Sequence, residues 1–153
     1  MKKIVTFICL GNICRSPMAE FLFKKIIQKN ANNKYEVLSA GTSGWNDGDD
    51  MHTETKKILN NLKIDVSNFY SKKLTDEIFQ KSDYIFVMDN QNYKDVIKKF
   101  GESKKVKKIT DYSTTKKYSE VPDPWYTKNF DETYQILNDA LLNIYEKIEN
   151  NEL

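Results

Sequence analysis

Residues 9–16, with the sequence Cys-Leu-Gly-Asn-Ile-Cys-Arg-Ser, constrain the fold of this chain more than any other segment. They follow an apolar run at 4–8 that predicts a buried strand, and they precede a stretch with helical periodicity. Ser16 and Pro17 favour the cap and first turn of a helix, so we expect the helix to begin there. A tight loop between a strand and a helix directs several backbone N–H groups and the positive helix end at one point. Such a loop binds phosphate-like anions.

Two side chains give this loop the chemistry of a nucleophile. Cys9 lies where the strand ends, and Arg15 lies at the far end of the loop with five residues between them. A helix N-terminus and a neighbouring guanidinium favour the ionised form of a thiol, so we expect Cys9 to be ionised at neutral pH. The planar guanidinium of Arg15 can hold two phosphate oxygens while the thiolate attacks phosphorus. The additional Gly11, Asn12 and Ser16 favour this interpretation over a purely structural cysteine.

Periodicity beyond the loop predicts strands that alternate with helices. Strands are expected at 4–8, 35–38, 84–88 and 106–109, and helices at about 18–29, 51–62, 75–79, 90–100 and 131–150. Residues 39–42 are expected to form a turn, and 111–129 a long loop. This order predicts an α/β fold with a four-stranded parallel sheet, helices on both faces and a single domain over residues 1–153. Ligands bind beyond the carboxyl ends of the strands in such a sheet, which is where Cys9 falls.

The sequence Val-Pro-Asp-Pro-Trp-Tyr at 121–126 offers the second half of the chemistry. When a thiolate attacks a phosphate ester, the leaving oxygen needs a general acid on the opposite side of phosphorus. Asp123 is flanked by two prolines that fix its backbone, in a long loop of the kind that is often functional. A plain Asp-Pro turn is the alternative, and the presence of the Cys9 loop favours catalysis. Because Asp123 must be protonated while the thiol is ionised, we expect activity to be highest on the acid side of neutrality.

Composition excludes several other classes of protein. With 24 basic and 22 acidic residues, the net charge of +2 gives no reason to expect a nucleic-acid or membrane partner. No apolar run is long enough for a signal-peptide core or a membrane span, so we expect a cytoplasmic protein, monomeric or at most weakly dimeric. Two cysteines in one loop and a single histidine, His52, lack the spacing of a metal site. We therefore expect no metal and no cofactor, and we expect His52 on a helix surface.

The loop and the Asp-Pro-aromatic segment resemble those of the low-molecular-weight protein tyrosine phosphatases, and the resemblance covers nearly the whole chain. The resemblance implies that Cys9 is the nucleophile, Arg15 the phosphate clamp and Asp123 the proton donor and base. It also implies that Asn12 braces the loop and that Ser16 hydrogen-bonds the thiolate. The further residues that it implies are the loop residues Leu10, Gly11, Ile13 and Cys14, whose backbone N–H groups would hold phosphate, and the pocket-wall aromatics Trp45, Trp125 and Tyr126.

The aromatic residues at the pocket mouth favour phosphotyrosine over the shorter phosphoserine, so the expected partners are tyrosine-phosphorylated proteins or aryl phosphates. Trp125 stands where most members of the family have tyrosine. One alternative is a protein arginine phosphatase of the same fold, which resembles a version with threonine in place of Ile13. An arsenate reductase would need further cysteines after Cys14, and none occurs. A non-catalytic phosphate-binding module is disfavoured because nucleophile, clamp and acid are all present.

Cys14 lies five positions after Cys9 on the same loop. As a hypothesis, Cys14 is a redox partner that captures oxidised Cys9 as a reversible disulfide and so protects it from irreversible oxidation. The alternative is a small residue packed beneath the loop.

Overall fold

The computed structural model describes residues 1–153 and contains one parallel sheet. Its strands are β1 (Lys3–Cys9), β2 (Tyr35–Gly41), β3 (Tyr84–Val87) and β4 (Val106–Lys108), in the spatial order β2-β1-β3-β4. The helices are α1 (Arg15–Lys29), α2 (Thr53–Asn61), α3 (Asp76–Lys81), α4 (Asn90–Phe100), the 3-10 helix η1 (Ile109–Tyr112), α5 (Pro124–Thr127) and α6 (Phe130–Glu149).

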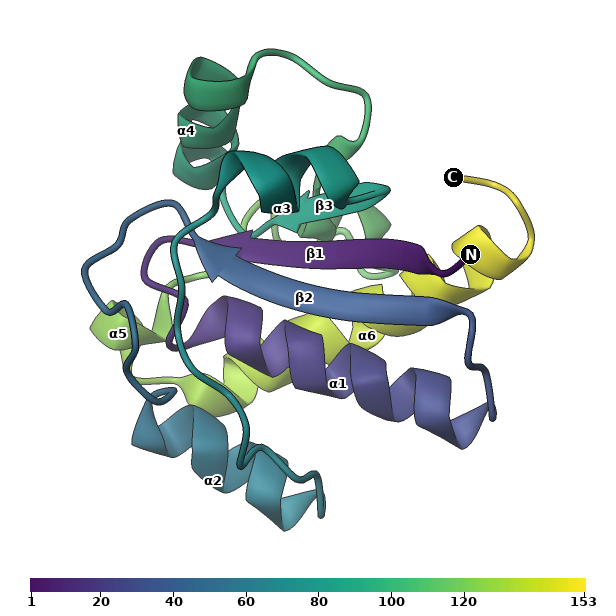
Figure 1. The fold of residues 1–153 in the computed structure, drawn as a ribbon. Coiled ribbons are helices and arrows are strands. Elements are labelled where there is room, and N and C mark those ends of the chain that lie inside the picture. Colours follow the sequence, from purple (N-terminus) through teal and green to yellow (C-terminus); the bar gives the residue numbers. More distant parts are fainter.

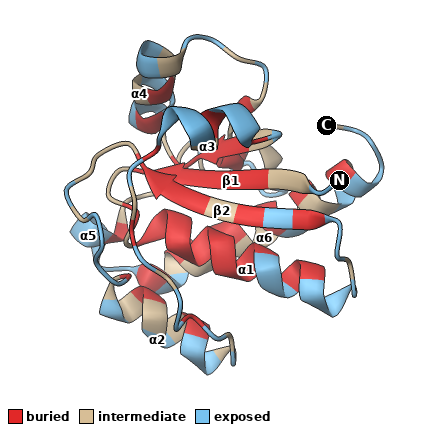
Figure 2. Cartoon of the chain, viewed as in Figure 1, coloured by how far each residue is buried: buried red, intermediate tan, exposed pale blue.

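Helices cover both faces of the sheet, as the sequence predicted. Figure 1 shows α1, α2 and α6 on one side of the strands and α3 and α4 on the other. Successive side chains of a strand point to opposite faces, so Phe7 enters a core of 25 buried residues beside α1 and α6, whereas Ile8 enters a core of eight beside α3 and α4. The buried residues accordingly follow β1 and the inner faces of α1 and α6 (Figure 2).

Strand β1 lies in the interior of the sheet, and the loop that follows it therefore emerges between two neighbours. β1 pairs in parallel with β2 and with β3, and Cys9 is in register with Gly41. The carboxyl ends of β1 and β2 point towards the left of Figure 1, where α5 also lies, while both chain termini lie at the opposite end. This topology brings the segments after β1, β2 and β3 together around one place.

The prediction that Ser16 caps the first long helix is wrong. α1 begins at Arg15, and its cap residue is Cys14, whose side chain makes no capping hydrogen bond. Ser16 is fully buried and its hydroxyl contacts Cys9 and Asn12 instead. The curvature of the loop turns this hydroxyl away from the helix end and towards the sulfur.

Three further expectations require correction. Residues 39–41 extend β2 rather than forming a turn, and they are small because the strand end packs directly against the loop. A Cβ atom added to Gly41 would lie 2.7 Å from the carbonyl oxygen of Leu10. His52 is not on the surface of a helix but caps the start of α2, where its ring accepts a hydrogen bond from Glu54 N–H. The expected loop 111–129 also contains the end of η1 and the whole of α5.

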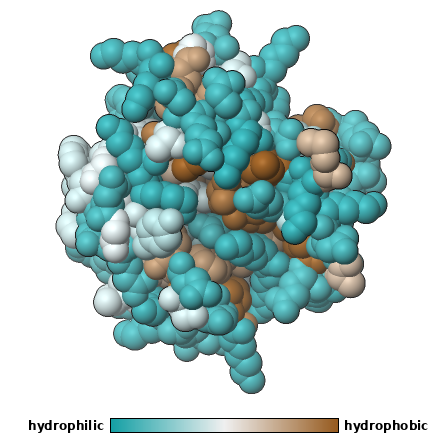
Figure 3. All heavy atoms as spheres, viewed as in Figure 1, coloured by the Kyte–Doolittle hydropathy of each residue, from teal (hydrophilic) through white to brown (hydrophobic).

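The remaining helix signals are confirmed, and they include two side-chain caps. Thr75 caps α3 and Asp89 caps α4, each through its side-chain oxygen, and α4 ends at Gly101 with φ of 88°. None of the helices combines the length and the hydrophobicity that a membrane crossing requires. Most of the surface in the view of Figure 3 is hydrophilic, and hydrophobic atoms gather mainly in its centre.

Candidate active site

The loop after β1 is held from outside through its carbonyl groups. The carbonyls of Cys9 and Leu10 accept from the backbone N–H groups of Thr42 and Ser43, and that of Ile13 accepts from His52 N–H at 2.8 Å. The carbonyls of Gly11, Asn12 and Cys14 accept hydrogen bonds from the side chains of Asn46, Ser71 and Thr55, respectively. Three separate segments of the chain thus fix the curvature of the loop.

The N–H groups of the same loop have no partner within the protein. None of the backbone N–H groups of residues 10–16 donates to another protein atom. They include the first N–H groups of α1, which no helix can satisfy internally. With every carbonyl turned outwards, the loop presents N–H groups and the positive end of α1 inwards, as a site for an anion does.

Cys9 lies at the base of this loop and has one close polar neighbour. Its Sγ atom is 3.0 Å from Ser16 Oγ, and both side chains are buried. Asn12 Nδ2 donates to Ser16 Oγ at 2.8 Å, so the hydroxyl proton of Ser16 is available to the sulfur. This hydroxyl is therefore positioned to donate a hydrogen bond to the sulfur that would attack a bound anion.

Asn12 is the centre of the network that supports the loop. It is fully buried with φ of 55°, a left-handed conformation that asparagine adopts more readily than most residues. Its amide donates to Ser39 Oγ as well as to Ser16, and its side-chain oxygen accepts from Lys72 N–H. Ser39 in turn donates to the buried carboxylate of Glu20. Every polar group of the Asn12 side chain is therefore used, which fixes its orientation.

Arg15 projects from the start of α1 to the opposite side of the loop. Its guanidinium is almost completely buried and donates to Asp89 Oδ2 at 2.8 Å and to the Val121 carbonyl at 2.9 Å. Its Nη2 atom lies 3.5 Å from Asp123 Oδ2. Burial disfavours the charged guanidinium, but the nearby Cys9, Asp123 and Asp89 outweigh it and raise the pKa of Arg15 above its ordinary value.

Asp123 is placed over the loop by the short helix α5. Its carboxylate caps this helix by accepting from Trp125 N–H at 3.0 Å, and Pro124 occupies the first helical position. The segment before it is tied to the sheet because Val121 N–H donates to the carbonyl of Met88, just after β3. Cys9 and Asp123 thus line one pocket, although they are 114 residues apart in the sequence.

This pocket has a volume of about 260 Å³ and a mostly apolar wall. Trp45 and Tyr126 are more than three-quarters exposed and Trp125 is half exposed, so large aromatic surfaces stand at the mouth. The lining residues are Cys9, Leu10, Gly11, Ile13, Cys14, Arg15, Trp45, Asn46, Asp123, Trp125 and Tyr126. The structure therefore brings together the residues predicted from sequence, with Asn12 and Ser16 directly behind the wall.

Cys14 also lines the pocket but differs from Cys9 in its surroundings. Its side chain is buried, and the chain contains no disulfide. Burial, together with the charges of Cys9 and Asp123, raises the pKa of Cys14 to about 12. Cys14 is therefore a protonated thiol at neutral pH.

Several residues around the site were missed by sequence reasoning. Asp89 was predicted only as a helix cap, and it also holds Arg15. Asn46, Thr55 and Ser71 hold loop carbonyls from segments that carry no recognisable motif. His52 was placed wrongly. No group of three or more histidine, cysteine, aspartate or glutamate side chains is arranged to hold a metal ion.

Comparison with known sequences agrees with this geometry. The family model described as low molecular weight phosphotyrosine protein phosphatase matches residues 4–153. The chain is 35% identical over 136 residues to the low molecular weight protein-tyrosine-phosphatase YfkJ of Bacillus subtilis, covering 87% of each chain. It is 37% identical over 149 residues to PtpA of Staphylococcus aureus, which bears the same description, covering 94% of this chain and 92% of PtpA.

Solved structures show the same similarity. The crystal structure of YfkJ superimposes with a TM-score of 0.95 at 31% identity, covering 100% of this chain and 98% of YfkJ. A protein tyrosine phosphatase from Entamoeba histolytica, crystallised with Hepes in its active site, gives a TM-score of 0.90 at 36% identity, covering 99% of this chain and 100% of that one.

Proposed function

The chain belongs to the low molecular weight phosphotyrosine protein phosphatase family and is a cysteine-dependent protein tyrosine phosphatase, and from this premise we propose the residues that carry its reaction. Cys9 is the nucleophile, Arg15 the phosphate clamp, and Asp123 the general acid and base. One observation carries the assignment: a loop whose N–H groups have no partner within the protein shares one pocket with the thiol of Cys9, the guanidinium of Arg15 and the carboxylate of Asp123.

In the first step, Cys9 attacks the phosphorus of the bound phosphate ester. The S–P bond forms as the bond from phosphorus to the aryl oxygen breaks, and Asp123 gives its proton to that oxygen. The N–H groups of residues 10–16 and the guanidinium of Arg15 bind the phosphoryl oxygens, and Ser16 stabilises the thiolate before attack. The products of this step are a free phenol and a phosphocysteine.

In the second step, water replaces the phenol. Asp123, now ionised, accepts a proton from the water molecule as its oxygen attacks phosphorus, and the S–P bond breaks to return the Cys9 thiolate and inorganic phosphate. The same carboxylate thus acts first as acid and then as base, from one position above the loop.

The ion pair between Arg15 and Asp123 supports this sequence of events. In the structure the carboxylate of Asp123 faces the guanidinium of Arg15. A phosphoryl dianion in the loop would take over the guanidinium and would release the Asp123 carboxyl from this ion pair, so that it could face the leaving oxygen. Substrate binding would in this way prepare the acid.

We propose phosphotyrosine as the substrate side chain. The aromatic side chains of Trp45, Trp125 and Tyr126 stand around the pocket mouth, where they would pack against the ring of the substrate. A protein arginine phosphatase of the same fold remains the alternative, and Ile13 in the pocket wall favours an aryl group over a guanidinium. We place the enzyme in the cytoplasm because its nucleophile is a free thiol that needs a reducing compartment. We propose that it acts there as a monomer on tyrosine-phosphorylated proteins.

Cys14 is proposed as the redox partner of Cys9. Peroxide would convert the Cys9 thiolate to a sulfenic acid, and attack by the Cys14 sulfur would form a disulfide and release water. The proximity of the two cysteines on the pocket wall supports this role, whereas the raised pKa of Cys14 makes the capture slow at neutral pH.

The experiment that tests the assignment is a kinetic comparison of phosphotyrosine, phosphoserine and phosphoarginine peptides on the purified protein and on its Cys9→Ser variant. We expect the parent to favour phosphotyrosine in kcat/KM, and the variant to lose turnover while still binding inorganic phosphate. A preference for phosphoarginine would replace the substrate assignment, and turnover retained by the variant would overturn the nucleophile.

A further inference from the structure

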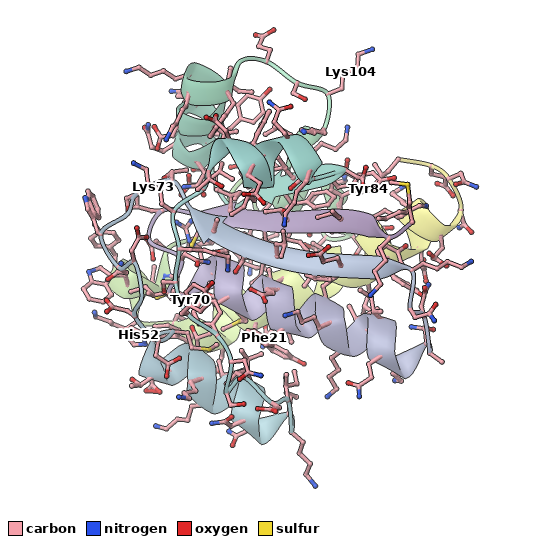
Figure 4. The ribbon with its side chains drawn as sticks, in the orientation of Figure 1. Phe21, His52, Tyr70, Lys73, Tyr84 and Lys104 are labelled. Atoms are coloured by element: carbon pink, nitrogen blue, oxygen red, sulfur yellow. The ribbon has the colours of Figure 1, made fainter.

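His52 lies between the two halves of the site. Its backbone N–H donates to the carbonyl of Ile13 in the phosphate loop at 2.8 Å. Its ring stacks on Phe130 at the start of α6, with centroids 4.6 Å apart, and meets the ring of Trp125 in α5 edge to face at 5.9 Å. Figure 4 shows His52 at the start of α2, on the side of the molecule where α5 lies in Figure 1.

The orientation of the imidazole is fixed from its own helix. Its Nδ1 atom accepts from Glu54 N–H at 3.0 Å as the cap of α2. This bond sets the rotation of the ring, and the stacked ring of Phe130 supports its other side. The imidazole is thus a rigid surface rather than a side chain free to rotate.

Trp125, which rests on this surface, is bonded to the proposed acid. Its backbone N–H donates to Asp123 Oδ1, so the position of Trp125 and the direction of the carboxylate are set together. Like the ion pair with Arg15, the ring contact with His52 links the turn at 123–127 to a residue that also contacts the phosphate loop. A change in that contact would move Asp123 relative to Cys9.

We propose that His52 is a positioning residue that sets the acid-bearing turn over the phosphate loop. It acts through Trp125 and does not itself touch the substrate or the transferred proton. The inference rests on the proposed role of Asp123, and it predicts a specific defect, which is poor protonation of the leaving oxygen with an intact nucleophile. Misplacement of a catalytic group by about 1 Å costs up to about a hundredfold in rate.

Two substitutions separate the functions of the imidazole. His52→Asn keeps a side-chain oxygen to cap α2 but removes the ring against Trp125 and Phe130. His52→Phe keeps an aromatic ring and removes the capping acceptor. Leu62→Ala, at the other end of α2 and packed on the main core, is the control for lowered stability without any change near Trp125.

The measurement is kcat/KM for a series of aryl phosphates of similar shape, from phenyl phosphate to 2,4-dinitrophenyl phosphate. Phenolate is a poor leaving group that needs a proton, whereas dinitrophenolate leaves without one. For His52→Asn we expect a loss of about tenfold on phenyl phosphate and less than about threefold on the dinitrophenyl ester. His52→Phe is expected to retain most activity on both, and Leu62→Ala to show no dependence on the leaving group.

The outcomes distinguish this inference from the assignment on which it rests. Equal losses on all esters, or no loss, in His52→Asn would overturn the positioning role. Asp123→Asn is measured in parallel. If that variant shows a steep leaving-group dependence and His52→Asn shows none, the positioning role of His52 is rejected while the assignment of Asp123 as the acid stands. If Asp123→Asn itself shows no leaving-group dependence, the general acid has been assigned to the wrong residue.

Discussion

The phosphate loop at 9–16 and the acid-bearing segment at 121–128, named for its proposed general acid Asp123, contribute to one pocket but are built in opposite ways. The loop is buried, with Asn12 fully enclosed, and all six carbonyls of residues 9–14 are bonded to surrounding segments. In the acid-bearing segment residues 125–128 are exposed, and a few contacts hold the segment, mainly from Met88, Arg15 and His52.

This difference separates two requirements of the reaction. Anion binding depends on many dipoles fixed before the substrate arrives, because reorientation during the reaction would cost much of their effect. Proton transfer depends on one carboxyl group, which must first give a proton to the leaving oxygen and then accept one from the attacking water. Damage to the loop should therefore reduce folding and catalysis together, whereas damage to the acid-bearing segment should reduce catalysis alone.

The largest expected effect comes from Asp123→Asn. Loss of the acid and base should lower kcat/KM for a phosphotyrosine peptide by about 10²–10⁴-fold. Asparagine still caps α5, so the free energy of unfolding should change by about 1 kcal/mol or less. Steady-state kinetics and urea unfolding on the same preparation test both parts, and a large loss of stability would show that the acid-bearing segment is as integral as the loop.

The next effect in size concerns Asn12→Gly. Glycine accepts the left-handed backbone, so the substitution isolates the lost hydrogen bonds to Ser16, Ser39 and Lys72. Leaving these buried partners unpaired should lower the free energy of unfolding by about 1–3 kcal/mol, and kcat/KM should fall as well.

A matched control is Lys63→Gly, at an exposed residue with φ of 61° whose side chain makes no hydrogen bond. That variant should be as stable as the parent or slightly more stable, since glycine relieves strain there. Thermal unfolding measures the change in stability of both variants. If Asn12→Gly is no less stable than Lys63→Gly, the hydrogen bonds of Asn12 contribute little to the stability of the loop.

The smallest expected effect concerns Cys14→Ala and depends on pH. Only the thiolate of Cys14 can attack an oxidised Cys9, and its fraction rises about tenfold per pH unit below the pKa of about 12. After brief peroxide treatment and reduction, the parent should regain more activity than the variant, and the difference should grow from pH 6 to pH 9. Identical recovery at pH 9 would remove Cys14 from any protective role.

Sequence patterns predicted most of the fold because the central strands and long helices have strong periodicity. β3 is a continuous apolar run, residues 4–8 of β1 are interrupted only by Thr6, and the caps Thr75 and Asp89 carry recognisable local signals. The error at Ser16 arose because a serine before a proline has a local reason to cap a helix. Tertiary contact with Cys9 and Asn12 outweighed that preference.

Sequence patterns predicted the residues that the structure brings to the pocket where those residues lie close together in the chain, as in 9–16 and 121–126. The supporting residues could not be found in this way, because they act across large separations in sequence. Arg15 meets Asp89 74 positions away, and Ser71 holds Asn12 over 59 positions. His52 escaped prediction because its role depends on Phe130 and Trp125, which only the packing of α5 and α6 brings beside it.

The inward N–H groups of residues 10–16 have a consequence for substrate selectivity and for product release. Backbone dipoles recognise the shape and charge of a tetrahedral oxyanion and carry no information about the group attached to it. Inorganic phosphate, the last product, binds to the same N–H groups as the ester, so its release costs free energy in each catalytic cycle. Selectivity must accordingly reside at the aromatic mouth, and a new substrate preference could arise there by exchange of exposed side chains while the loop stays unaltered.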